Sequence, residues 1–196
     1  MFTHNFKTKH DLKIFLVFKE TNLKSLRKYI KIPKNIIQDF TREEGQIFSF
    51  YDSKKPIILV SLGIKSKINS EKLKKIIKNV KKSRNSFKNK KILYFLEEEN
   101  DSLLKQQIQE INNSHYHFDY KTRKNKRTGK RSLKKSNSPN YQIFLKSKKI
   151  NQENQITINE SINLLKKLGD EPSNILTPLE YIKRIEKVCE DCGLEL

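Results

Sequence analysis

The chain has 196 residues, and Leu, Ile, Val and Phe make up about 30% of them, which is enough apolar material for a folded core despite a net charge of +20. No apolar run approaches the roughly 18 residues that a membrane span needs, and the early run from Ile14 to Phe18 is too short for the core of a signal peptide. Because there are only two cysteines, a disulfide-scaffolded secreted domain is also excluded, and the sequence predicts a soluble cytoplasmic protein without a membrane partner.

The first predicted elements are a strand and a short helix. Lys13–Phe18 is a continuous apolar run of strand length. Asn22 is a suitable N-cap for the helix that follows, and Pro33 is expected to end it, because proline cannot continue the helical hydrogen bonds. The apolar positions of this helix are Leu23, Leu26 and Ile30.

Two strands and the clearest helix come next. Gln46–Tyr51 and Pro56–Leu62 have strand composition, and the turn-like segment 52–55 between them predicts an antiparallel pair. Ser70 begins a helix whose apolar residues recur at helical spacing, with lysines on the other face. These apolar residues are Leu73, Ile76, Ile77 and Val80.

The alternation of strands and helices continues to residue 145. Lys91–Leu96 is a strand, Asp101 or Ser102 can cap the next helix, and Tyr141–Leu145 is the last strand. That helix carries Leu103, Leu104, Ile108 and Ile111. Strand, helix, strand, helix, strand is typical of a mainly parallel sheet. The sequence therefore predicts an α/β domain over residues 1–150, with a mixed sheet flanked by helices.

From Ile150 onward the sequence is helical, and residues 151–196 are predicted to be a helical connector and the start of a missing domain. Gly169 is expected to stop the first helix, whereas Thr177 and Pro178 begin the second, which Gly193 ends. The apolar stripes are Ile158, Ile162, Leu165 and Leu168 in the first helix, and Leu179, Ile182, Ile185, Val188, Cys189 and Cys192 in the second. Residues 194–196 have the composition of a beginning strand.

Two small clusters of metal-binding residue types have plainer interpretations. Cys189 and Cys192 form a C-x-x-C pair, but structural zinc needs four ligands, and both cysteines lie on an apolar stripe, which favours packing in the core. His115, His117 and Asp119 lie where a helix ends and lack a further ligand nearby. We expect these histidines to lie at the C-terminal end of the helix, where the negative end of the helix dipole stabilises a positive charge.

No catalytic set can be assembled from the sequence. The segment 128–130, Thr-Gly-Lys, resembles the end of a phosphate-binding loop, but Lys124 stands where that motif requires glycine. Glycine-rich dinucleotide motifs, the serine-hydrolase motif and the zinc-peptidase motif do not occur. We therefore predict no catalytic or metal-binding residue on this chain.

Residues 121–135 have nine basic side chains and no acidic one, and without periodic apolar residues they are predicted to form a loop. The abundance of Lys, Ile and Asn is what an A/T-rich genome encodes over almost any fold, so a solvated insertion is one interpretation. The other is a surface that contacts phosphates or an acidic partner. The candidate phosphate-contacting residues are Lys121, Arg123, Lys124, Lys126, Arg127, Lys130, Arg131, Lys134 and Lys135.

The segment Asn163–Pro178 reads NLLKKLGDEPSNILTP. It resembles the linker of the leucyl (cytosol) aminopeptidase family, which reads close to NLARDLVNEPANVLTP. The matching residues are Asn163, Leu164, Leu168, Glu171, Pro172, Asn174, Leu176, Thr177 and Pro178, and the departures are at Lys166, Lys167, Gly169 and Asp170. Residues 60–80, 116–122 and 181–196 also resemble, more loosely and in the same order, segments of that family.

The resemblance implies a macro-domain-like N-terminal domain that a helix joins to a catalytic domain. In that family the second domain holds two divalent metals, zinc or manganese, which would activate water for attack on a peptide carbonyl, and members assemble as hexamers. The motifs that carry those ligands are absent here, so no cofactor is expected on this chain.

The leading hypothesis is that the chain is the non-catalytic N-terminal part of a leucyl-aminopeptidase-like protein, either truncated or split from its catalytic half. Its expected partners are that half or further copies of itself. One alternative is a basic α/β module that binds nucleic acid or an acidic partner through residues 121–135. A third hypothesis is a protein that assembles through the former oligomer surface.

Overall fold

The computed structural model describes residues 2–3, 10–84, 87, 91–116, 140–146 and 151–194, and the backbone of residues 122–124 and 131–133. The chain divides into two compact units, Met1–His115 with Ser138–Ile156, and Tyr116–Asn137 with Thr157–Leu196. No helix in the described part of the chain is long and apolar enough to cross a membrane.

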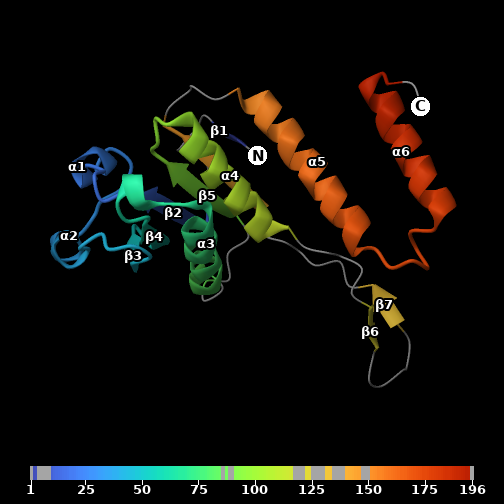
Figure 1. The fold of residues 1–196 in the computed structure, drawn as a ribbon. Coiled ribbons are helices and arrows are strands. Elements are labelled where there is room, and N and C mark those ends of the chain that lie inside the picture. Colours follow the sequence, from blue (N-terminus) through green and yellow to red (C-terminus); the bar gives the residue numbers. More distant parts are fainter. Residues whose placement is uncertain are drawn as a thin grey trace. The chain divides into compact units, whose positions relative to one another are not determined.

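The first unit is built on a six-stranded sheet with the strand order β1-β8-β5-β2-β4-β3. Neighbouring strands are parallel except for β3 and β4, which are antiparallel. The strands are β1 (Phe2–Thr3), β2 (Leu12–Val17), β3 (Ile47–Asp52), β4 (Lys55–Ser61), β5 (Lys91–Leu96) and β8 (Asn140–Leu145). Figure 1 shows the strands β2 to β5 of this sheet between two pairs of helices. The predicted α/β fold and the antiparallel pair are confirmed.

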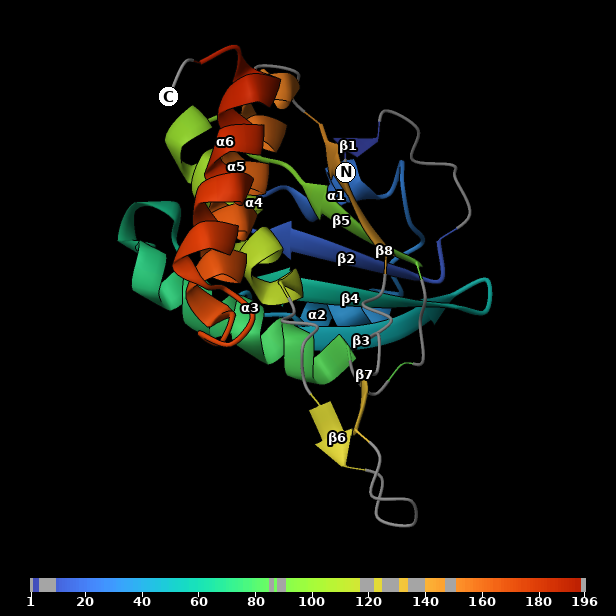
Figure 2. The ribbon, with the colours of Figure 1, turned by 90° about the vertical axis from the view of Figure 1, so that its right-hand side faces the viewer.

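Helices cover both faces of this sheet (Figure 2). Successive residues of a strand point to opposite faces, so Leu12, Ile14 and Leu16 of β2 pack with one pair of helices, while Phe15 and Val17 pack with the other pair. The first pair is α3 (Ser70–Arg84) and α4 (Asp101–His115), and the second is α1 (Leu23–Leu26) and α2 (Lys34–Asp39). The buried strands therefore read as continuous apolar runs, which made them visible in the sequence.

The second unit contains a two-stranded antiparallel hairpin and two helices. The hairpin pairs β6 (Thr122–Lys124) with β7 (Arg131–Leu133). Helix α5 (Gln152–Asp170) begins in the first unit and continues in the second, and α6 (Pro178–Cys192) follows it. As predicted, the Thr177 side chain caps α6, and Gly193 ends it with a φ of 68°, in the left-handed region that glycine adopts readily.

Several predicted helix boundaries are wrong. Asn22 caps α1, but α1 ends at Leu26, and Pro33 is the N-cap of α2, a helix that the sequence did not predict. The side chain of Asn100, rather than Asp101 or Ser102, accepts the capping hydrogen bond of α4. Gly169 lies inside the last turn of α5, because glycine in a right-handed conformation does not by itself stop a helix.

Candidate functional site

The parallel strands β2, β4, β5 and β8 end at one edge of the sheet, where α/β proteins commonly bind ligands. The chain leaves β2 towards α1 on one face and leaves β5 towards α4 on the other, so the neighbouring strands β2 and β5 form a topological switch point. Gly63 lies in the loop after β4 with a φ of 77°, and a Cβ atom there would meet the Cα of Glu44 at 3.2 Å. Glycine is therefore required at this edge.

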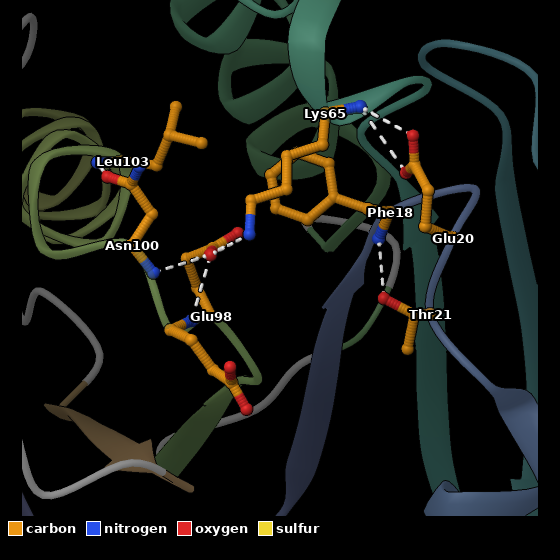
Figure 3. A network of polar contacts seen from close by, with 8 residues as sticks. Phe18, Glu20, Thr21, Lys65, Glu98, Asn100 and Leu103 are labelled. Atoms are coloured by element: carbon orange, nitrogen blue, oxygen red, sulfur yellow. Dashed lines mark hydrogen bonds and ion pairs between the residues drawn. The ribbon is translucent and has the colours of Figure 1, made fainter.

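Glu98 is the central polar residue of this edge, and Figure 3 shows its carboxylate between two loops. The side chain is 1% exposed and forms an ion pair with Lys65 from the loop after β4. Its Oε1 also accepts hydrogen bonds from the backbone N–H groups of Glu99 at 2.8 Å and Asn100 at 2.7 Å. The carboxylate thus fixes the loop that leads into α4, because Asn100 in turn caps that helix at Leu103 N.

A second set of contacts joins the loops after β2 and β4. The backbone N–H of Lys65 donates to the Glu20 carboxylate at 3.1 Å, and the backbone N–H of Phe18 donates to Thr21 Oγ1 at 3.1 Å (Figure 3). Glu97 pairs with Lys146, which follows β8. Within the described residues no three His, Cys, Asp or Glu side chains gather as metal ligands. These contacts fix the loops at this edge to one another.

The basic run from 121 to 135 is not wholly a loop. The backbone of β6 and β7 pairs Arg123 with Ser132 and Lys124 with Arg131, so the predicted loop is wrong for these two short segments. Each of these strands has only three residues, and most of them are basic or polar. The alternation of apolar and polar residues that identifies a strand is therefore missing from the sequence. The other candidates, Lys121, Lys126, Arg127, Lys130, Lys134 and Lys135, lie outside the described residues.

His115 belongs to a buried cluster at the C-terminal ends of α3 and α4. Its Nε2 lies 2.7 Å from Nη1 of Arg84 and 3.0 Å from the hydroxyl of Tyr94. The imidazole also stacks on Tyr141, with ring centroids 3.9 Å apart. The cluster joins two helices to strands β5 and β8 through one histidine.

Burial, with Arg84 and Lys81 nearby, lowers the pKa of His115 to about 2. The ring is therefore neutral at physiological pH, and its Nε2 lone pair accepts from Arg84. The prediction that His115 lies at the helix end is confirmed, but the expected favourable charge is absent, because desolvation outweighs the helix dipole. His117 and Asp119 lie outside the described residues.

The cysteine prediction is wrong. Both thiols are free, Cys189 is partly exposed and Cys192 is exposed, and no residue of α6 is buried. The apolar stripe predicted on α5 is only partly covered, since Ile158 is 49% and Leu165 is 68% exposed whereas Leu168 is buried. An amphipathic pattern identifies an apolar face but does not say what covers it.

Glu171, from the linker segment that resembles the aminopeptidase family, is buried and tied to α6. Its Oε2 accepts from Arg184 Nη1 at 2.6 Å, and Arg184 Nε donates to Glu180 at 2.9 Å. The Glu-Pro turn is therefore fixed to the helix that follows it. This contact gives a structural role to one residue of the sequence resemblance.

No protein-family model matches the sequence, and a search of curated proteins finds no match. Solved structures do share its fold. The bottromycin maturation enzyme BotP in complex with Mn matches with a TM-score of 0.60 and 12% identity over 94% of this chain. A mutant tomato leucine aminopeptidase matches with a TM-score of 0.59 and 16% identity over 97% of this chain. The match covers 37% and 41% of those chains, so this chain spans about two-fifths of their length.

The residues that sequence reasoning missed are Lys65, Glu98 and Arg84. Glu98 had a usable signal, because an acidic run directly after a buried strand lies at the carboxyl edge of a parallel sheet. Lys65 and Arg84 had none, since each is one lysine or arginine among 42.

Proposed function

We propose that this chain is the non-catalytic N-terminal part of a leucyl-aminopeptidase-like protein, and that α6 packs against the metal-binding catalytic domain. The observation that carries the proposal is the apolar face of α6, on which Leu179 and Ile182 are exposed and no residue is buried. The linker resemblance at 163–178 and the shared fold support the same conclusion.

The exposed apolar area on α6 is large for one helix. Leu179 is 75% exposed, Ile182 is 51% exposed and Tyr181 is 46% exposed. Fully burying a side chain such as Leu or Ile contributes about 1.5 to 3 kcal/mol, so covering this face would stabilise a complex by several kcal/mol. An interface with a second domain explains why a helix that is apolar on one face has no buried residue here.

Peptide hydrolysis is assigned to the partner domain. A two-metal mechanism requires several convergent carboxylates to hold the ions and the attacking water, and the described part of this chain offers no cluster of three ligands. Binding of zinc or manganese would accordingly require the complete protein. The same holds for the homo-oligomeric assembly of the family.

The test is recovery of the native protein from its cells with an antibody against this chain. We expect mass spectrometry to find a metallo-aminopeptidase domain, on the same or a second polypeptide, and the preparation to hydrolyse a leucyl amide with added Mn²⁺. The double substitution Leu179→Glu and Ile182→Glu should abolish that association. The matched control is Lys183→Gln with Lys187→Gln, which makes the same charge change on the opposite, exposed face of α6.

Three results would refute the proposal: native protein that carries no such domain, equal association of both double variants, or metal-dependent turnover by the purified 196-residue chain alone. The last would place the catalytic residues on this chain.

A second candidate function, binding of nucleic acid through residues 121–135, is favoured by the β6–β7 hairpin, because a two-stranded ribbon can present basic side chains to phosphates. Changing Arg123, Lys124, Lys126 and Arg127 to Gln should reduce the slope of log affinity against log salt by about 3 to 4 on duplex DNA. The control changes Lys74, Lys75, Lys78 and Lys82, which are exposed on α3, to Gln. Equal slopes for the two variants in a fluorescence-anisotropy titration would end this candidate.

A further inference from the structure

Arg84 is a buried cation with half of its guanidinium unused. The residue is 6% exposed, and its Nη1 lies 2.7 Å from Nε2 of His115 and 3.4 Å from the hydroxyl of Tyr94. Nε and Nη2 make no hydrogen bond with the described residues, and no described carboxylate forms an ion pair with Arg84. Among the described residues, the edge that normally binds a carboxylate or phosphate through two parallel hydrogen bonds therefore has no partner.

The surroundings of Arg84 do not supply the missing negative charge. Lys81 lies one turn earlier on α3, and burial together with Arg84 lowers the pKa of its amine. His115 is neutral, and burial raises the pKa of both Tyr94 and Tyr141, so these hydroxyls stay protonated. Among the described residues the cluster therefore holds two cations and no anion.

The helix ends near Arg84 compensate only part of this charge. Arg84 is the last residue of α3 and His115 the last of α4, so the C-terminal carbonyl groups of both helices favour a cation here. That effect is several-fold smaller than the desolvation penalty of a buried ion, so the described residues do not balance the charge of Arg84.

The unpaired polar atoms nearby are donors. Tyr141 donates to Asn112 Oδ1 at 2.6 Å, and Asn112 Nδ2 is enclosed without an acceptor among the described residues. Arg84 itself keeps a small exposed area, 6% of its surface. A ligand with acceptor oxygens and a negative charge would satisfy the unused edge of Arg84.

We propose that the Nε–Nη2 edge of Arg84 binds a small oxyanion of the phosphate, sulfate or carboxylate class, with Lys81 as the second cation. The small exposed area of Arg84 limits the ligand to a free ion or a terminal group. The site lies on the first unit and is independent of the function proposed for α6.

The test is thermal unfolding of the full chain in phosphate, sulfate and acetate series, each balanced with chloride to constant ionic strength. A ligand that binds the folded state raises the melting temperature in a saturable way, by about 5 to 10 °C at a hundredfold excess over its dissociation constant. We expect this rise in the parent and in Lys82→Met, whose substitution removes an exposed charge from the same helix. Arg84→Met should show none of it. The acetate arm distinguishes a carboxylate ligand from phosphate and sulfate.

A second readout keeps the test decisive if Arg84→Met does not fold. Phosphate should shift the imidazole NMR resonances of His115 in the parent, because its Nε2 contacts Arg84, and Arg84→Lys should weaken the response, because lysine keeps the charge but loses the planar fork. Unshifted His115 resonances together with no saturable rise for any of the three anions would overturn the proposal. An equal rise in the parent, Arg84→Met and Lys82→Met would also overturn it, because that pattern reports only the overall charge.

Discussion

Replacing Glu98 with alanine is expected to lower the free energy of unfolding by about 1.5 to 3 kcal/mol, the contribution of hydrogen bonds to a charged group. The carboxylate is 1% exposed, accepts from the backbone N–H groups of Glu99 and Asn100, and pairs with Lys65. Lys65 is 40% exposed and regains water when its partner is lost, so the main loss comes from the two backbone donors. Urea unfolding measures the difference.

The control is Glu99→Ala, which makes the same charge change at the neighbouring exposed position and should stay within about 0.5 kcal/mol of the parent. Glu98→Gln should be intermediate, because the amide oxygen can accept one of the backbone hydrogen bonds but carries no charge. If Glu98→Ala and Glu99→Ala unfold at the same urea concentration, the edge network does not hold the loops together.

The sheet could be predicted because its strands are buried on both faces. Runs such as Lys91–Leu96 are almost continuously apolar, and the structure places the strand β5 over those same residues. The ends of the helices were harder. Pro33 ends one helix in the prediction but begins another in the structure, because proline is compatible with the first turn of a helix as well as with its end.

The candidate site could not be predicted, because its contacts join residues far apart in the chain. Lys65 meets Glu98, and Arg84 meets His115 from the next helix, and neither pairing leaves a local pattern. The stripe on α6 shows the opposite case. Its periodicity was correct, but the prediction that Cys189 and Cys192 are buried in the core failed, because periodicity carries no information about the partner of a face.

Acidification is expected to destabilise the chain through His115 well above the range where carboxylates titrate. The pKa of His115 is about 2 in the folded state, below the ordinary value of 6.5. His115 therefore takes up a proton near pH 6.5 in the unfolded chain but stays neutral in the folded chain. The stability associated with the neutral ring is therefore present above pH 6.5 and is lost as the pH falls towards 2. The slope is about 1.4 kcal/mol per pH unit, which makes about 2 kcal/mol between pH 6.5 and pH 5.

Among the described residues, the charged and titratable groups that face this imidazole do not reverse the sign. Arg84 and Lys81 from α3 are cations that oppose its protonation, while Tyr94 from β5 and Tyr141 from β8 are neutral. His115→Gln keeps an acceptor for Arg84 but does not titrate, so the difference between parent and variant isolates this one residue from the other three histidines. The measurement is urea unfolding at pH 7.5, 6.5, 5.5 and 5 in chloride buffers free of phosphate and acetate, since an oxyanion on Arg84 would itself favour a charged His115. Parallel loss of stability in both proteins would show that His115 accepts its proton in the folded state as readily as in the unfolded chain, and the buried Arg84–His115 contact would then have to open in solution.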